Sequence, residues 1–288
     1  MADAVTTPFA VWRNDARTFR NAAESYVEHG GEFRYLGQIV EYFGDQELAA
    51  ITPFDVRQMA MALYPTQSNA TRNRCALTPA RAVLIHGYER GWCPLMRLPR
   101  FRQEPPKRKS PASVAWLQIF VRQCDLDGLP HLAALVIFMS QTGARVSEAV
   151  ALRWAQVDLF ARKVTLLKTK TTTNSERGLT DAMVKRLRQL GSEGANPNGH
   201  VFTYRSRFSI NDRIMAVCER AGIPYKSSHA CGRHSFATNA ILMGTDVKAT
   251  MEAGSWKSVD VFMGTYVHVR NAARLVADRF NGIEFDVL

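Results

Sequence analysis

The sequence predicts a mainly α-helical protein with a small antiparallel β-sheet, divided into two domains. Apolar residues recur at helical spacing through most of the chain, whereas short runs between residues 157 and 179 are typical of strands. A chain of 288 residues is too long for one ordinary hydrophobic core. We therefore expect a helical domain at residues 1–103, a linker at 104–111 and a second domain at 112–288.

The first domain is predicted to be helical with one basic side. Its aromatic and aliphatic residues follow helical spacing, for example in the runs Phe9–Trp12 and Leu36–Phe43. Between Arg72 and Lys109 the chain carries ten arginine and lysine residues but only two glutamates. Residues 102–111 contain three prolines and no aliphatic or aromatic side chain, which favours an extended linker over a helix or a strand.

The second domain is predicted to alternate between helices and a short run of strands. Ser110-Pro111 is typical of a helix N-cap followed by the first helical position, so we expect a helix over Ala112–Gln123. A long apolar run, Leu132–Met139, predicts a helix that stops at Gly143. Strands are expected at Val157–Leu159, Lys163–Lys168 and Glu176–Leu179, and further helices at Asp181–Leu190, Asn211–Ala221, His234–Met243, Val247–Ala253, Val259–Tyr266 and Asn271–Phe280.

The composition indicates a polyanionic partner. The formal net charge is +11 at pH 7 and the pI is about 9.7, which favours nucleic acid as the partner first and an anionic membrane surface second. No apolar run of about 18 residues could span a bilayer, and the first residues lack the features of a signal peptide. Five scattered cysteines without a Cys-x-x-Cys pair indicate free thiols in a reducing compartment. We therefore expect a cytoplasmic protein that associates with the nucleoid through DNA.

The stretch TGARVSEAVALRW places an arginine where an anion would be expected. The helical pattern ends at Gly143 and starts again with Arg145, and Glu148 follows three residues later. A new helix N-terminus exposes backbone N–H groups that favour an anion over a cation. The position of Arg145 therefore suggests a phosphate between the two helices, although a first-turn arginine alone is more often a surface cation or a partner of a glutamate such as Glu148.

Two further segments carry clusters of chemically active side chains. One holds His229, Arg233 and His234 among small and apolar residues, and the other holds Trp256 and, ten residues later, Tyr266. Together with the first stretch they resemble the pattern of the tyrosine recombinase (phage integrase) family. That pattern runs T-G-x-R-x-x-E-x-x-x-L-x-W, then a hairpin lysine, then His-x-x-Arg-His, then Gly-His/Trp and a Tyr. The first block fits this sequence at every fixed position.

The resemblance implies a role for each domain and a set of site residues. The basic, helical first domain resembles the family's core-binding, SAM-like DNA-binding domain, and the second resembles its DNA breaking-rejoining catalytic domain. The catalytic residues implied are Arg145, Lys170, His229, Arg233, Trp256 and Tyr266, with Glu148 as the carboxylate that holds the first arginine. The basic residues expected to contact DNA are Arg72, Arg74, Lys107, Arg108 and Lys109.

Two spacings depart from the family pattern. Arg233 follows His229 by four positions, where the family has three, so His234 is an alternative for the active-site histidine. Trp256 precedes Tyr266 by ten positions, one more than is usual. One extra residue rotates a helical side chain by roughly 100°, so we expect both insertions to be absorbed in turns.

The hairpin lysine also has two candidates. Lys168 and Lys170 are two positions apart, so strand alternation places them on the same face and cannot separate them. The stretch Gly178-Leu-Thr resembles the family's Pro-Leu-Thr at the end of the hairpin. Counting back from Gly178 favours Lys170.

These residue types suit phosphodiester chemistry. Attack on a phosphodiester adds charge to a crowded pentavalent phosphorus, so catalysis depends on electrostatic stabilisation and positioning. Arg145 and Arg233 stay protonated and can bind oxygens bidentately. Tyr266 is the expected nucleophile, and a phosphotyrosine stores the bond energy for rejoining, so no ATP and no metal cofactor is expected. A metal site is not favoured, because His229 and His234 are five positions apart rather than four.

By the resemblance, the chain is expected to be a site-specific DNA recombinase or integrase that works through a 3′-phosphotyrosine. Lys170 would protonate the departing 5′-oxygen, His229 would orient the phosphate, and Trp256 would pack on the site. The expected partners are a double-stranded recombination site, three further copies in a homo-tetramer on synapsed DNA, and accessory DNA-bending or directionality proteins. Two alternatives are a type IB topoisomerase-like enzyme that relaxes DNA and a catalytically impaired DNA-binding protein of the same fold.

Overall fold

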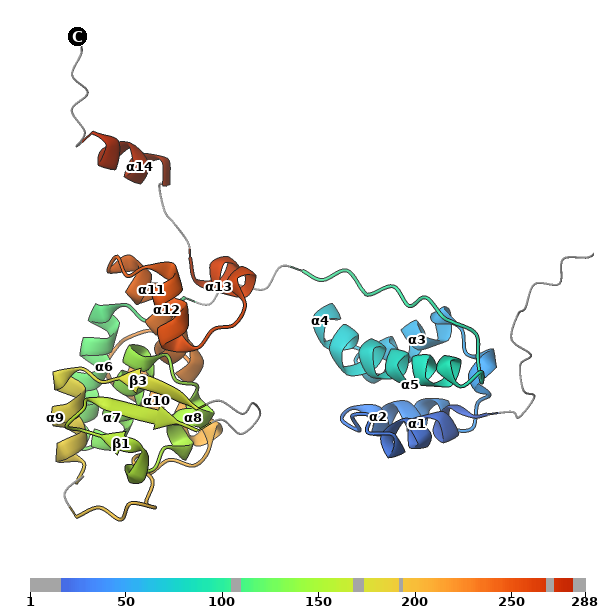
Figure 1. The fold of residues 1–288 in the computed structure, drawn as a ribbon, viewed down its shortest axis with the longest axis horizontal. Helices are drawn as coiled ribbons and strands as arrows, with labels where there is room; N and C mark the ends of the chain where they lie inside the picture. The colour runs from blue at the N-terminus through green and yellow to red at the C-terminus, as the bar shows by residue number, and fades with distance from the viewer. Residues whose placement is uncertain (1–16, 105–109, 168–173, 192–193, 268–271, 282–288) are drawn as a thin grey trace, which may run out of the picture. The chain divides into compact units, whose positions relative to one another are not determined.

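The computed structural model describes residues 17–104, 110–167, 174–191, 194–267 and 272–281. The chain forms two compact units, Met1–Lys107 and Arg108–Leu288 (Figure 1), and the division falls within the segment 104–111 predicted as the linker. Each unit has its own hydrophobic core. The predicted fold class, mainly helical with a small antiparallel sheet, is confirmed. Among the described residues, every helix is too short or too polar to reach across a lipid bilayer.

The first unit is a set of short helices with capped ends and one shared core. Thr18 and Thr52 each start a helix, because their side chains accept a backbone N–H three residues further on. Phe19, Ile39 and Met59, one from each of three helices, are fully buried in the core. The elements are α1 (Phe19–Glu28), α2 (Leu36–Phe43), η1 (Leu48–Ala50), α3 (Pro53–Leu63), α4 (Asn69–Arg72), the π-helical turn η2 (Asn73–Leu77) and α5 (Thr78–Glu89).

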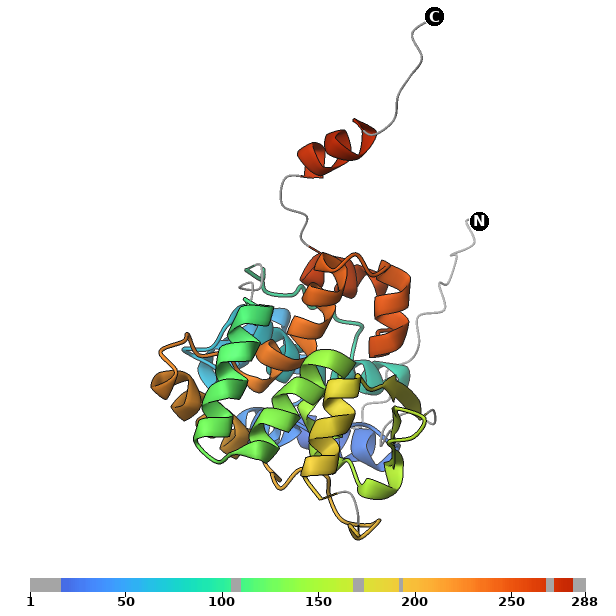
Figure 2. The same cartoon turned by 90° about the vertical axis from the view of Figure 1, so that its left-hand side faces the viewer.

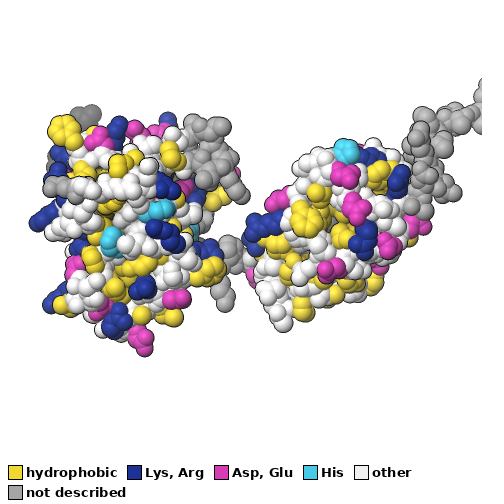
Figure 3. Space-filling view, turned by 90° about the horizontal axis from the view of Figure 1, so that it is seen from below, with side chains coloured by type: hydrophobic (Ala, Val, Ile, Leu, Met, Phe, Trp, Pro, Cys, Tyr) yellow, Lys and Arg dark blue, Asp and Glu magenta, His cyan; other side chains and the backbone are white. Residues whose placement is uncertain are grey.

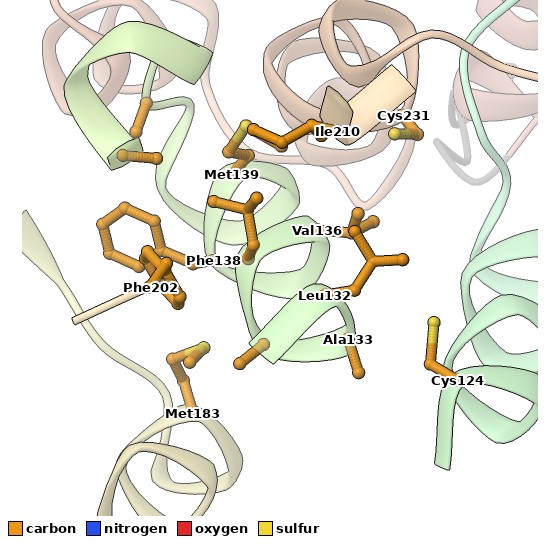
Figure 4. Close-up of a cluster of buried hydrophobic side chains, with 14 of the residues drawn as sticks. Cys124, Leu132, Ala133, Val136, Phe138, Met139, Met183, Phe202, Ile210 and Cys231 are labelled. Carbon is orange, nitrogen blue, oxygen red and sulfur yellow. The ribbon is translucent and has the colours of Figure 1, made fainter. Parts of the chain in front are cut away.

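The core of the second unit surrounds α7 (Pro130–Thr142), whose middle residues, Leu132–Met139, are all apolar and, except for Ile137, buried. Figure 4 shows side chains from several elements meeting those of α7, and the rings of Phe138 and Phe202 lie 5.6 Å apart between centroids. Figure 2 shows α7 between α6 (Val114–Leu126) and α9 (Asp181–Gln189). A helix that is apolar all round must be buried in this way, which fixes the position of its C-terminus.

The small sheet lies beside these helices and has the order β1-β2-β3 with both pairs antiparallel. Its strands are β1 (Val157–Asp158), β2 (Lys163–Leu166) and β3 (Ser175–Gly178). The register pairs Val164 with Arg177, so both side chains belong to the buried face of their strands. Strands β2 and β3 lead into residues 168–173, which lie outside the described residues.

The remaining helices of the second unit begin and end close to the predicted residues, with two exceptions. Helix α6 begins at Val114, because Ser113 rather than Ser110 is its N-cap. Helix α10 begins at Arg207, earlier than predicted, with Ser206 as its N-cap. The other elements are α8 (Val146–Ala151), η3 (Trp154–Gln156), α10 (Arg207–Arg220), the π-helical turn η4 (Ala230–His234), α11 (Ser235–Leu242), α12 (Val247–Gly254), α13 (Val259–Tyr266) and α14 (Ala272–Phe280).

Candidate active site

The turn between α7 and α8 presents Arg145. Gly143 ends α7 in the left-handed region with φ of 66°, and a Cβ added there would lie 2.8 Å from Cδ1 of Phe236, so this turn requires glycine. Arg145 is the N-cap of α8. Its Nη1 donates to Oε1 of Glu148 at 2.7 Å, and its backbone N–H donates to Oε2 of the same carboxylate at 2.8 Å. Glu148 therefore holds both the backbone and the side chain of Arg145.

The Glu148 carboxylate lies at the start of α8, and the phosphate that the sequence suggested beside Arg145 stays a prediction. The backbone N–H of Arg145 is already occupied by that carboxylate. The side chain of Arg145 is 50% exposed, whereas that of Glu148 is 15% exposed. A phosphate arriving from solvent would therefore meet the guanidinium of Arg145 rather than the backbone of α8.

Arg233, unlike the half-exposed Arg145, is held in place by being buried among other segments of the second unit. It is 4% exposed, and its guanidinium carbon lies 3.6 Å from the ring centroid of Trp256. Its Nη1 donates to the carbonyl oxygens of Gly143 at 2.5 Å and Gly254 at 2.8 Å. Burial, and then the nearby charge of Arg145, lowers the pKa of Arg233 to about 10, so the guanidinium is still protonated at neutral pH.

The extra residue between His229 and Arg233 lies in the π-helical turn η4. The backbone of η4 is not regular helix throughout, because it kinks at Gly232 between two helical segments. Gly232 within it has φ of −98° and ψ of −106°, and a Cβ there would lie 2.7 Å from Cβ of Met139. The close approach to α7 therefore requires glycine, and the insertion is accommodated without displacing Arg233 from the core.

Tyr266, at the end of α13, lies among the aromatic side chains of this site. It is 6% exposed, and its ring centroid lies 4.8 Å from that of His234 and 5.3 Å from that of Trp256. The ring of His229 lies 6.1 Å from that of His234. The fold thus gathers Tyr266, Trp256, both histidines and Arg233 in one place, although they come from segments separated in the sequence.

The turn after α12 determines where the Trp256 ring lies. Ser255 caps α12 in the left-handed region with φ of 52°, which is unusual for a residue other than glycine. A Cβ added to Gly254 would lie 1.7 Å from Cζ3 of Trp256, so the ring covers the backbone of that glycine. Residues 256–258 are outside any helix, so the longer spacing between Trp256 and Tyr266 interrupts neither α12 nor α13.

Sequence reasoning missed Arg177, a buried arginine on β3. It is 3% exposed, and its Nη1 donates to the carbonyl oxygen of Ala253 at 2.6 Å and to Oγ of Ser255 at 3.0 Å. Burial lowers the pKa of Arg177, whereas the charge of Glu148 raises it. The available signal was strand alternation, because Arg177 shares a face with the buried Leu179.

Several predicted residues are not placed at this site. Lys168 and Lys170, and likewise Lys107, Arg108 and Lys109, lie outside the described residues. In the first unit, Arg74 is exposed. Arg72 is part-buried and donates to the carbonyl oxygens of Tyr64 and Pro65 and to the side chain of Asn69, so its guanidinium stabilises its own unit. These residue predictions stay predictions. Figure 3 shows histidine side chains beside basic side chains on one face of the second unit.

The cysteines are free and buried. Burial raises the pKa of Cys124 to about 12 and that of Cys93 to about 11, so both thiols stay protonated at neutral pH. Within the described ranges, no group of three or more His, Cys, Asp or Glu side chains could hold a metal ion. The side chains gathered at the candidate site carry guanidinium, imidazole, indole, carboxylate and phenol groups.

Comparison with known proteins decides the family. A model of the phage integrase family matches residues 123–273, more than half of the chain. The chain belongs to the phage integrase family. Among curated relatives, the integrase of Salmonella phage P22 is 25% identical over 207 residues, which cover 65% of this chain and 51% of the phage protein. The tyrosine recombinase XerD of Mycobacterium tuberculosis is 27% identical over 263 residues, which cover 80% of this chain and 83% of XerD. This phage integrase family chain thus matches about half the length of the P22 integrase and most of XerD.

Solved structures agree in fold. The Tn1549 transposon integrase in complex with circular intermediate DNA superposes with a TM-score of 0.71 at 16% identity, covering 91% of this chain and 99% of that chain. The XerH site-specific recombinase bound to palindromic difH substrate superposes with a TM-score of 0.64 at 19% identity, covering 84% of this chain and 73% of that chain. At such low identity these likenesses show that this family member has the same fold.

Proposed function

We propose that this protein is a site-specific DNA recombinase that cleaves and rejoins DNA strands. The observation that carries the proposal is a surplus of positive charge beside a tyrosine. Arg145, Arg177 and Arg233 lie close enough that their charges influence one another, and Glu148 is the carboxylate among them. Tyr266 lies beside them, because its ring and the Arg233 guanidinium both pack against the ring of Trp256. Such a cluster suits a phosphate anion, because buried cations need a compensating charge.

In the proposed reaction, the phenolic oxygen of Tyr266 attacks the phosphorus of one phosphodiester. The phenolic oxygen gives up its proton, with His229 as the proposed acceptor, and bonds to the 3′-phosphate. The bond to the 5′-oxygen breaks, and the departing oxygen takes up a proton as a 5′-hydroxyl. Arg145 and Arg233 bind non-bridging oxygens and stabilise the charge of the pentavalent state. Rejoining is the reverse reaction with a 5′-hydroxyl from the partner strand, so bond energy is conserved.

The remaining residues have supporting roles in this proposal. His229 orients the phosphate, and His234, whose ring packs against Tyr266, keeps the tyrosine in place. Trp256 covers Arg233 and excludes water from its charge. Lys170 is the proposed acid that protonates the 5′-oxygen, with Lys168 as the alternative.

The alternatives differ in partner and in activity. A type IB topoisomerase-like enzyme would relax supercoiled DNA without pairing two sites, whereas the proposed recombinase acts as a tetramer on two synapsed sites, assisted by DNA-bending or directionality proteins. A catalytically impaired DNA-binding protein is disfavoured because Arg233, Trp256 and Tyr266 are brought together despite both insertions.

Covalent trapping tests the proposed function. A duplex with a nick close to the scissile phosphate loses a short fragment after cleavage, so the protein remains attached to the DNA. We expect the parent protein to form this adduct and Tyr266→Phe to bind the duplex normally without forming it. Tyr225→Phe, a change at a 47% exposed tyrosine of the same unit, serves as the matched control and should trap like the parent. An adduct formed by Tyr266→Phe would contradict the assignment of the nucleophile.

A sulfur-substituted substrate tests the lysine. A 5′-sulfur leaves without protonation, so losing the general acid matters only for the ordinary 5′-oxygen. Lys170→Ala should cleave the ordinary duplex slowly and recover on the sulfur duplex, whereas Lys168→Ala should show a smaller defect that is equal on both. Rescue of Lys168→Ala alone would assign the acid to that lysine instead.

A further inference from the structure

The end of α12 is bound by two buried arginines from different parts of the chain. Arg233 donates to the carbonyl oxygen of Gly254, while Arg177 donates to the carbonyl oxygen of Ala253 and to Oγ of Ser255. The last carbonyls of a helix have no partners within the helix and carry partial negative charge, so they are good acceptors for guanidinium donors. Three consecutive residues are thereby fixed between β3 and η4.

The Ala253–Ser255 turn is followed directly by Trp256, whose ring covers Arg233. Ser255 is held in the left-handed region, a conformation that costs free energy for a residue with a side chain and persists only where its surroundings enforce it. The Trp256 ring then lies against the backbone of Gly254 and 3.6 Å from the guanidinium carbon of Arg233. A change in the Ser255 turn would move the ring and, with it, one wall of the pocket around Arg233.

Within the described residues Arg177 forms no ion pair, although the charge of Glu148 acts on it. Its hydrogen bonds within the described residues go to the carbonyl oxygens of Glu176 and Ala253 and to the Ser255 hydroxyl, and its Nε is buried without a partner in that part of the chain. Burying a cation in this way costs free energy that an apolar side chain would avoid. Its position is therefore better explained by what it holds than by a contribution to stability.

We propose that Arg177 is a positioning residue for DNA cleavage: it fixes the Ala253–Ser255 turn so that Trp256 keeps Arg233 aligned on the scissile phosphate. This inference rests on the proposed function, because it assigns to Arg177 an effect on the charge-stabilising step. Arg177 itself does not touch the phosphate in this proposal. Its loss should therefore reproduce, in weaker form, the loss of Arg233.

The test uses the full-length protein and two nicked duplexes in single-turnover cleavage. One carries an ordinary scissile phosphodiester, and the other carries a methylphosphonate, in which a methyl group replaces a charged non-bridging oxygen. A neutral phosphonate removes much of the need for charge stabilisation by a guanidinium. Arg177→Met should slow cleavage of the ordinary duplex about 10- to 100-fold at saturating DNA, with unchanged affinity, as expected for misplacement of a catalytic group. On the methylphosphonate duplex the same variant should cleave within about threefold of the parent, because the aligned guanidinium is no longer required.

Three further variants keep the test decisive. Arg186→Met removes a partly buried arginine of the same unit that pairs with Asp125, and it should cleave both duplexes like the parent. Ser255→Ala removes one acceptor and leaves the buried cation in place, so it should show a smaller defect with the same dependence on the substrate, even if Arg177→Met fails to fold. Arg177→Lys, which retains the charge but has one donor group, should restore part of the rate.

The outcomes separate this inference from the proposed function. If Arg177→Met and Ser255→Ala slow both duplexes equally, or slow neither, the positioning role is wrong while the recombinase function stands. If the parent protein itself forms no adduct with the ordinary duplex at its own recombination site, the proposed function is wrong.

Discussion

Arg145 and Arg233 of the second unit both place a guanidinium at the candidate site, but different kinds of contact hold the two side chains in position. Arg145 is half exposed and is held by the carboxylate of Glu148, three residues away on the same helix. Arg233 is buried under the Trp256 ring and donates to carbonyl oxygens from two other turns. The first arrangement depends on a local charge pair, whereas the second depends on the packing of distant segments. We therefore expect the two sites to respond differently to the same substitution.

The largest difference is expected for lysine substitutions. Arg233→Lys should lower the cleavage rate about 100- to 1000-fold, since an ammonium cannot donate to two carbonyls, lie flat on Trp256 and still reach the phosphate. Arg145→Lys should lose less, because a lysine can still pair with Glu148 at the exposed site. Single-turnover cleavage of the nicked duplex measures both. If Arg233→Lys retained more activity than Arg145→Lys, the claim that the buried Arg233 tolerates substitution less well than the exposed Arg145 would be wrong.

A smaller effect is expected when the backbone of the turn at Gly143, whose carbonyl accepts from Arg233, is changed. Gly143→Ala should lower the free energy of unfolding by about 2 to 4 kcal/mol, because it adds left-handed strain and a contact with Phe236. Gly128→Ala is the matched control, since Gly128 has nearly the same φ of 65° and open space around it, and it should cost only about 1 to 2 kcal/mol. Urea denaturation compares the two. Equal losses would mean that Phe236 accommodates the new methyl group.

The smallest effect is expected for a change at Glu148, the carboxylate that pairs with Arg145. Glu148→Gln should slow cleavage about tenfold, because a neutral amide holds Arg145 through weaker hydrogen bonds than a carboxylate does. Asp125→Asn, which weakens the ion pair with Arg186 elsewhere in the unit, should leave the cleavage rate unchanged. A Glu148→Gln variant as fast as the parent would show that the Arg145 guanidinium needs no partner for its alignment.

The same contrast explains how much of the site could be predicted from the sequence. Arg145 and Glu148 are three positions apart on one helix, so their pairing follows from helical geometry, as does the left-handed glycine that ends α7. Arg177 could not be assigned a role, because the carbonyl that it binds lies 76 positions away on α12. Helical propensity and spacing carry no information about such a partner.

The fold shows the same division between local and distant causes. The helices that begin at Asp181, Val247 and Val259 start where they were predicted, because local capping side chains decide their starts. Helix α6 starts later than predicted, with Ser113 as its N-cap. Ala112 stays outside the helix: its N–H donates to Oγ of Ser235, 123 positions away, and its carbonyl accepts from Nδ2 of Asn239. The local signal at Ser110-Pro111 carries no information about these tertiary contacts of Ala112.

The central claim is that segments far apart in the sequence form one phosphate site with Tyr266 as its nucleophile. Its most direct test is to digest the trapped protein–DNA adduct with a protease and identify the modified peptide by mass spectrometry. We predict that the 3′-phosphate is attached to the phenolic oxygen of Tyr266. A nucleotide attached to any other side chain would contradict the account.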